Sequence, residues 1–463
     1  MKEELIFKHR GFSTLEIIIA VAIVLIALAV AASALFSVDL STLGGELSLA
    51  SVSTLEKYFI EISQSSNDTV SVGTDITQCI QRVHIEDVGL IRGIPRAVSA
   101  EFLVVDTHFP EQIKESCYAP EPHAQDWAEY SVQSFLLSDV VHQETITDID
   151  VVSGIAYISL TSDSPTSTDL IVFDTEQGSV ISSTDIGKGI VALDAIQGYV
   201  FTANESSTTQ LSVIRTDTLE HPTVVAERGL QGVDPYGSFP YGRSVTYVDG
   251  IVYVGTRETA GPEFHMFDVH NLESPYEVSF LELSHNVHDI SAKNGFAYLA
   301  TSADTKEIII LDVHDPWTIH EVGSFNAGTS ASADRDAMSE YLIGTTLYAG
   351  RRRGNAQTRE LYAIDMASST APLERFSVRV PLSGTTHISG LIAQGNVLFV
   401  SSTDPAYGFS VYDMSDVGNV RRLETTVFAE AIDALDSENG VVYGVSNSKK
   451  SIYVFKPSRV YAH

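Results

Sequence analysis

Five polar side chains recur at one place in a repeated sequence pattern, and they are the residues of this chain best suited to bind a ligand. Counting back seven residues from a repeated glycine, or eight in two copies, gives Arg243, His288, Asp336, His387 and Asp433. Two imidazoles and two carboxylates suit a divalent cation, whereas an arginine among them suits an anion. Polar residues also line water-filled channels without any function, and the sequence leaves that interpretation open.

Catalysis is less favoured than binding at these residues. The sequence contains no hydrolase elbow, P-loop, dinucleotide-binding glycine motif or zinc-protease motif. No nucleophile–base pair stands out beside the five polar residues. We therefore expect a binding protein and not an enzyme, with no cofactor, although the side-chain types at the site would also accept a divalent cation.

The repeated glycines mark the elements that must position these side chains. Seven of them open an apolar strand at intervals of 44 to 52 residues: Gly154, Gly198, Gly250, Gly295, Gly344, Gly395 and Gly440. A second apolar strand follows each glycine, then a turn that often contains proline, then a more exposed strand. Four short strands in each unit of 40 to 50 residues are typical of propeller blades. We place each glycine in the tight turn between the first two strands, where a positive φ is often needed.

The fold class that follows is mainly β, a seven-bladed β-propeller over residues 133–463. The seventh copy stops after its third strand, and residues 134–141 read as a fourth strand that precedes the first copy. We expect residues 133–142 to complete the last blade and close the ring. The second apolar strand usually ends in aspartate, as at Asp174, and this pattern resembles the LVIVD family of bacterial surface propellers. The copies that end at Arg215 and Lys456 lack the aspartate.

The start of the chain predicts a membrane anchor. Lys2, Lys8 and Arg10 precede residues 17–36, an apolar run interrupted only by Ser33. Twenty residues form a helix of about 30 Å, which spans a bilayer. The positive-inside rule places the N-terminus in the cytoplasm and the rest outside a cell membrane that the chain crosses once. An ordinary signal peptide or signal anchor is the alternative.

Residues 11–16 resemble the leader of type IV prepilins. The resemblance implies that a prepilin peptidase removes residues 1–11 by cutting after Gly11 and methylates Phe12. It also implies that Glu16 pairs with the terminal amine of a neighbouring subunit, and that residues 12–40 form the transmembrane assembly helix. No proline lies between Phe12 and Phe36, which favours a minor pilin or pseudopilin over a major pilin.

Residues 41–132 separate the anchor from the propeller. A polar–apolar helical stretch is predicted first, at residues 46–63, then strands at residues 69–72, 83–91 and 97–105, which together resemble a small pilin-like α+β linker domain. The two cysteines of the chain, Cys79 and Cys117, both lie here, and an oxidising compartment would favour a disulfide between them. A featureless stalk is the alternative for this segment.

Composition narrows the class of partner. The chain has 60 acidic and 28 basic residues and a formal net charge of -32. This charge argues against nucleic acid and against anionic membrane surfaces as partners. The dense basic cluster at residues 351–353 is predicted to be a solvated hairpin tip, with the docking of an acidic partner or a polysaccharide as the alternative.

These observations predict a membrane-anchored, minor pilin-like or pseudopilin-like protein that displays a β-propeller for adhesion or partner binding. Its expected partners are the prepilin peptidase, the assembly subunits of a pilus or of a system like type II secretion, and an extracellular protein or glycan. It would then reside at the cell surface, alone or in a filament. The alternative is a tethered extracellular propeller enzyme that acts on sugars or small metabolites through its central channel.

Overall fold

A computed structural model describes residues 80–91, 94–105, 127–162, 164, 166–233, 241–327, 336–353, 358–416, 419–423 and 428–458. The chain divides into two units, residues 1–120 and 121–463. The predicted leader and anchor, with Gly11, Phe12 and Glu16, lie outside the described residues, as do Cys79 and Cys117. In the part of the chain that the structure describes, no helix has the length and apolar character needed to cross a membrane.

The described part of the first unit is one antiparallel hairpin. It consists of β1 (Ile80–Ile91) and β2 (Ile94–Val105), paired along their whole length. The two strands agree with the strands predicted at residues 83–91 and 97–105.

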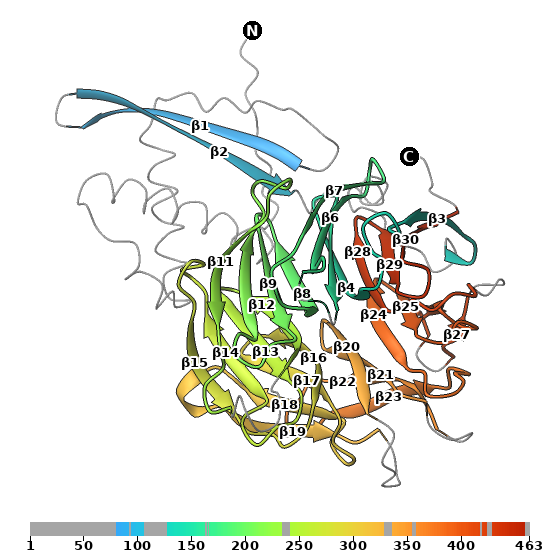
Figure 1. The fold of residues 1–463 in the computed structure, drawn as a ribbon. Helices are drawn as coiled ribbons and strands as arrows, with labels where there is room; N and C mark the ends of the chain where they lie inside the picture. Colours follow the sequence, from blue (N-terminus) through green and yellow to red (C-terminus); the bar gives the residue numbers. More distant parts are fainter. Residues whose placement is uncertain are drawn as a thin grey trace, which may run out of the picture. The chain divides into compact units, whose positions relative to one another are not determined.

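The second unit is a propeller of seven four-stranded antiparallel sheets, as predicted (Figure 1). We number the blades in chain order from the sheet of β4 to β7. The innermost strands are β4 (Thr145–Val152), β8 (Ile190–Ile196), β12 (Gly242–Val248), β16 (Val287–Lys293), β20 (Ala337–Ile343), β24 (Ile388–Gln394) and β28 (Ala434–Glu438). Each innermost strand contacts those of the next and the previous blade, and β28 contacts β4, so the ring is closed.

The remaining strands of each blade run outward from the channel. The second strands are β5 (Ile155–Thr161), β9 (Tyr199–Asn204), β13 (Ile251–Thr256), β17 (Phe296–Thr301), β21 (Thr346–Arg351), β25 (Val397–Ser402) and β29 (Val441–Ser446). The third strands are β6 (Leu170–Asp174), β10 (Leu211–Arg215), β14 (Phe264–Asp268), β18 (Ile308–Asp312), β22 (Leu361–Asp365), β26 (Phe409–Asp413) and β30 (Ser451–Pro457). The outermost strands are β7 (Ser179–Thr184), β11 (Thr223–Arg228), β15 (Tyr276–Leu281), β19 (His320–Phe325), β23 (Leu373–Val378), β27 (Arg421–Arg422) and β3 (Tyr130–Leu136). A single turn of 3₁₀-helix, η4 (Pro316–Thr318), precedes β19.

All seven repeated glycines lie in the turns between the first and second strands, with φ between 53° and 84°. In four of these turns the residue before the glycine also has a positive φ: Ser153, Asp249, Asn294 and Asn439. Positive φ at both central positions defines a type I′ turn, whose twist matches that of the flanking strands. The repeated glycines therefore mark the tight turn that joins the first and second strands of each blade.

The ring is closed by a strand from the N-terminal side of the propeller, but its bounds differ from those predicted. Strand β3 pairs with β30 from Tyr130 opposite Pro457 to Leu136 opposite Ser451. The ring of Tyr130 packs edge-on against Phe455, at 5.8 Å, which extends the strand toward the N-terminus. The predicted end of the strand, residues 137–142, is instead a turn that begins at Leu137.

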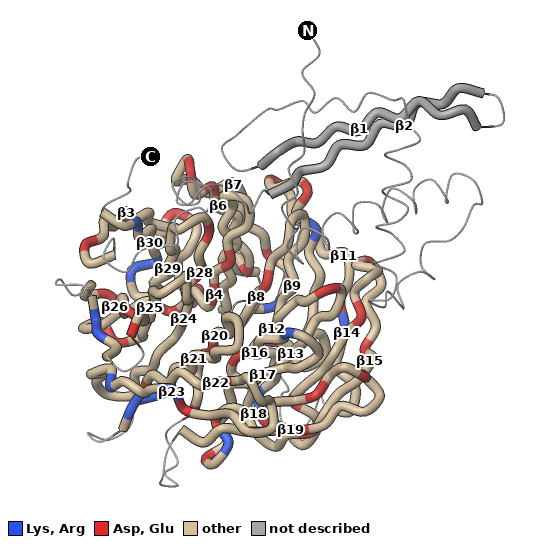
Figure 2. The backbone as a smooth tube through the Cα atoms, turned by 180° about the vertical axis from the view of Figure 1, so that it is seen from behind, with Lys and Arg blue, Asp and Glu red and all other residues tan. Residues whose placement is uncertain are grey.

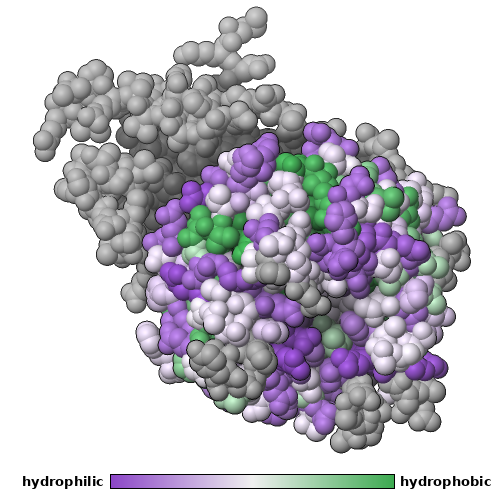
Figure 3. Space-filling view, in the orientation of Figure 1, coloured by the Kyte–Doolittle hydropathy of each residue, from purple (hydrophilic) through white to green (hydrophobic). Residues whose placement is uncertain are grey.

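The core lies between the blades, on both faces of each sheet. The second and third strands are almost wholly buried, and aromatic rings fill the joint between blades six and seven, where Phe409 and Phe455 stack at 4.0 Å. The face drawn in Figure 3 is mostly hydrophilic, and Figure 2 shows acidic residues distributed along the backbone throughout the propeller. The fold thus holds the innermost strands rigidly around a channel.

Candidate ligand site at one mouth of the channel

A β-bulge in six of the seven innermost strands turns one residue out of the strand ladder. The bulged residues are Thr147, Val191, Arg243, His288, Met338 and Ser389. Asp433 takes the same place in blade seven, immediately before β28, and its N–H donates to the carbonyl oxygen of Val445. A bulge re-aims the side chain of the extra residue. All seven side chains line one cavity of about 470 Å³ in the channel, and we call them the bulge ring.

Three of the five predicted site residues belong to this ring: Arg243, His288 and Asp433. In blades five and six the ring holds Met338 and Ser389, not the predicted Asp336 and His387. The reason is the register of the turns. Residues 344 and 395 come first in their two-residue turns, whereas the glycines of the other blades come second. In these two copies the ring residue therefore lies six residues before the glycine, and not the eight that were predicted.

Asp336 and His387 nevertheless lie beside the ring, each one residue before its innermost strand. The Oδ2 atom of Asp336 is 3.8 Å from the Nε2 atom of His288 and 3.6 Å from the Nη2 atom of Arg352. The backbone of Arg352 forms an isolated β-bridge with that of His387. Consecutive blades thus bring these side chains together at one mouth of the channel.

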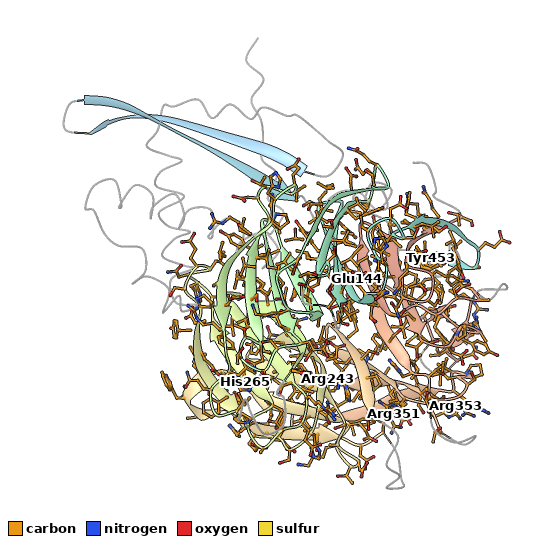
Figure 4. The ribbon with its side chains drawn as sticks, in the orientation of Figure 1. Glu144, Arg243, His265, Arg351, Arg353 and Tyr453 are labelled. Carbon is orange, nitrogen blue, oxygen red and sulfur yellow. The ribbon has the colours of Figure 1, made fainter. Side chains whose placement is uncertain are left out.

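Arg243 is the cation of the bulge ring, and its guanidinium makes no hydrogen bond or ion pair with any described residue. Figure 4 shows it nearer the middle of the ring of blades than Arg353. Burial lowers the pKa of Arg243, and the charges of Arg257 and Arg352 lower it further, while Asp336 opposes them. An arginine in this position is ready to pair with an incoming anion.

The two histidines at this mouth are held neutral. Burial, with the nearby charges of Arg243 and Arg352, lowers the pKa of His288 to about 3. The same causes lower the pKa of His387 to about 4. The side chain of His288 is only 5% exposed, and its Nε2 atom has no hydrogen-bond partner. The buried Nε atom of Arg352 has none either.

The basic cluster at residues 351–353 is not a solvated hairpin tip, so that prediction is wrong. Arg351 ends β21 and is 1% exposed, and its Nη2 atom donates to the Oε1 atom of Glu307 at 2.7 Å. Arg352 faces the channel mouth. Only Arg353 is exposed, with its Nη1 atom donating to the carbonyl oxygen of Gly384. Arg351 is therefore part of the buried core, and Arg352 is part of the candidate site.

Deeper in the channel, carboxyl groups of the innermost strands tie neighbouring blades together. Five accept a backbone N–H from the next blade: Asp148 from Leu193, Asp150 from Ala195, Asp194 from Tyr247, Asp289 from Glu340 and Asp436 from Val151. Each of these acids lies four or six residues before its glycine. Their regular spacing from the repeated glycines is the sequence signal for this role.

These channel acids, with Glu340, hold their protons more tightly than ordinary carboxyl groups. Burial raises the pKa of Asp148 to about 7 and that of Asp289 to about 6, while burial and the charge of Asp150 raise that of Asp194 to about 8. Burial also raises the pKa of Asp433, whose Oδ2 atom accepts the backbone N–H of Asn447. Among the described residues, no three His, Cys, Asp or Glu side chains converge as metal ligands would. The chemistry of the mouth favours an anion over a cation.

No protein-family model matches this sequence, and the search of curated proteins finds no match. Solved structures share the fold. One is virginiamycin B lyase from Staphylococcus aureus, with 12% identity over 71% of this chain and 99% of that chain and a TM-score of 0.52. Another is the Pan2 WD40 domain from Neurospora crassa, with 11% identity over 73% of this chain and 98% of that chain and a TM-score of 0.50.

A chain of the mitotic checkpoint complex is similar as well, with 9% identity over 70% of this chain and 90% of that chain and a TM-score of 0.52. At such identities the likeness shows the fold alone. The protein is therefore a seven-bladed β-propeller. Its resemblances to prepilins and to LVIVD propellers stay predictions.

Proposed function

We propose that this chain is a cell-surface binding protein, a minor pilin-like or pseudopilin-like subunit that displays its propeller and binds a partner at the channel mouth. One observation carries the proposal. The unpaired guanidinium of Arg243 and the buried, unpartnered Nε2 atom of His288 both face a cavity of about 470 Å³. Such a volume is typical of ligand pockets, and buried polar atoms without partners are rare in native proteins.

The hydroxyl groups of the bulge ring support binding rather than catalysis. The Oγ1 atom of Thr147 donates to the carbonyl oxygen of Ile190 at 2.6 Å, and the Oγ atom of Ser389 donates to that of Ile432 at 2.5 Å. Both hydroxyls thus hold the next blade, and neither is paired with an imidazole that would activate it. No observation favours the tethered enzyme.

Display at the cell surface rests on the N-terminal sequence. The prepilin-like motif at Gly11 and Phe12, the acid at Glu16 and the apolar run behind them support export and assembly. The excess of acidic residues suits a soluble surface exposed outside the cell. A propeller is much larger than the helix that would anchor it, which supports a minor or tip subunit over a bulk filament subunit.

Cell attachment and processing together test this proposal. Cells that express the full chain with a prepilin peptidase should expose the propeller and carry an N-terminus that begins at Phe12. Gly11→Ala should leave the leader uncut. Deletion of the gene should weaken attachment to surfaces coated with glycans or proteins, and Arg243→Gln should weaken it equally.

The matched control is Arg353→Gln, which removes an exposed arginine from the same region and should leave attachment unchanged. Attachment that is lost on deletion but unaffected by Arg243→Gln would place the binding surface elsewhere. An exported chain whose deletion changes no attachment would refute the binding function itself.

A further inference from the structure

We infer that the channel mouth binds a tetrahedral oxyanion, the phosphate or sulfate ester group of a small ligand. This inference rests on the proposed binding function and names the chemistry of the same site.

The nitrogen atoms come from four consecutive blades. Blade three supplies Arg243, blade four His288, blade five Arg352 and blade six His387. Two of these side chains, His288 and Arg352, each have a buried nitrogen atom without a hydrogen-bond partner. A planar carboxylate is satisfied by one guanidinium fork, whereas donors from several directions match the oxygens of a tetrahedral anion.

Positive charge at the mouth exceeds negative charge. The charges of Arg257 and Arg352 both act on Arg243, and the charge of Asp336 opposes them. Across the ring, Asp433 has a raised pKa and is itself bonded to a backbone N–H. The carboxyl groups of Asp336 and Asp433 thus stand against three arginines, and an anion would relieve the mutual repulsion of the arginines.

The surroundings select a small ligand over a polyanion. The carboxyl groups of Asp148, Asp194 and Asp289 line the same cavity below the mouth, and the chain as a whole carries a net charge of -32. A long sulfated or phosphorylated polymer would be repelled by this charge along most of its length. A single ester group can sit at the mouth while the uncharged remainder of its ligand occupies a cavity of about 470 Å³.

The two histidines supply a second property of such a site. They are neutral in the ligand-free protein because burial and the arginine charges lower their pKa values. A bound dianion would offset those charges and raise the pKa of both imidazoles. His288 would then gain a proton and donate to the anion, so binding would take up protons.

Titration calorimetry on the full chain, purified in detergent, tests this inference with inorganic sulfate, methyl sulfate, methyl phosphate and acetate at constant chloride. Sulfate and both esters should bind saturably, and acetate much more weakly. Arg243→Gln should weaken sulfate binding roughly tenfold or more, as the loss of a charged hydrogen bond predicts. Arg243→Lys keeps the positive charge but loses the forked guanidinium. Its affinity for sulfate should lie between those of the unmodified protein and of Arg243→Gln. Arg353→Gln should bind as the unmodified protein does.

A preference between the two esters would identify which kind of ligand the site takes. No saturable binding of any oxyanion, equal binding of acetate and sulfate, or sulfate binding unchanged in folded Arg243→Gln protein would each overturn the inference. Attachment of cells through Arg243 without oxyanion binding would leave the proposed function standing. Oxyanion binding by a chain that is never displayed at the cell surface would support the oxyanion site and refute the proposed display function.

Discussion

The Nε2 atom of His288 in blade four lies 3.8 Å from the Oδ2 atom of Asp336, which belongs to blade five. This is too long for a hydrogen bond, and the histidine is neutral. The same carboxylate lies 3.6 Å from Arg352. The carboxylate of Asp336 therefore lies where an anionic ligand would contact His288 and Arg352. It supplies part of the negative charge that such a ligand would bring.

Removal of this carboxylate should strengthen anion binding. Asp336→Asn leaves the volume of the side chain almost unchanged but frees Arg352 from its negative partner and raises the positive potential at Arg243. We expect the dissociation constant for sulfate to fall several-fold, measured by calorimetry at neutral pH. Weaker binding in a variant that melts at the same temperature as the unmodified protein would contradict this role for Asp336.

Sulfate binding should tighten as the pH falls from 7.5 to 5.5, a range chosen around the ordinary histidine pKa of about 6.5. Sulfate keeps its own charge throughout this range, so the change must come from the protein. Its causes are the uptake of protons by His288 and His387 when the anion raises their pKa values, and by Asp148, Asp194 and Asp289, whose pKa values of about 7, 8 and 6 lie near this range. Calorimetry in two buffers of different ionisation enthalpy measures that uptake directly.

The control for this pH dependence is His288→Gln, which keeps a donor but cannot gain a charge. Its proton uptake on binding should fall but not vanish, because His387 and the channel acids still titrate. Equal uptake in this variant and in the unmodified protein would exclude His288 from the response.

The channel acids should lower the stability of the propeller as the pH rises. The folded-state pKa of Asp194 is about 8, against an ordinary value of 3.8. The folded protein thus binds more protons than the unfolded chain in this window, and its stability falls from about pH 4 to pH 8. The histidines act in the opposite sense, because a lowered pKa costs stability as the pH falls below about 6.5.

A variant isolates the acid contribution from that of the histidines. Asp194→Asn keeps an oxygen that accepts the N–H of Tyr247 but removes the titration. Relative to the unmodified protein, it should gain roughly 3–4 kcal/mol between pH 5 and pH 8 in urea unfolding. The exposed Asp139→Asn is the matched control and should show no such gain. A flat difference between Asp194→Asn and the unmodified protein would show that Asp194 titrates normally.

The buried pair of Arg351 and Glu307 joins blades four and five and should be needed for stability. Arg351→Met would leave the Glu307 carboxylate buried without its cation, at a cost of about 3–5 kcal/mol in the free energy of unfolding. Adding Glu307→Leu should restore most of that loss, because it removes the uncompensated charge. A double variant as unstable as the single one would show that packing, not charge, explains the loss. The exposed Arg353→Met should change stability by less than about 0.5 kcal/mol.

Much of the propeller could be predicted because its turns impose a local chemical rule. A type I′ or similar turn needs positive φ, glycine supplies it, and seven such glycines at blade spacing give the number of blades. The closing strand could be predicted from the incomplete last repeat. Its bounds could not, because the packing of Tyr130 against residues more than 270 positions away decides where it begins.

The candidate site was only partly predictable, for two physical reasons. The glycines at 344 and 395 come one place earlier in their turns than the others, a shift that depends on hairpin register and not on residue type. Arg352 was missed because a run of three arginines reads as a solvated turn, whereas alternation along β21 and its continuation sends its members in different directions.

Arg243 is the residue at which an anionic ligand should bind in the channel mouth. The most direct test is an anomalous difference map from crystals of the full chain soaked in selenate, which has the shape and charge of sulfate. We expect a selenium peak within hydrogen-bond reach of Arg243 and His288, which is lost in crystals of Arg243→Gln. A fully occupied selenate elsewhere on the propeller, with none at the mouth, would contradict it.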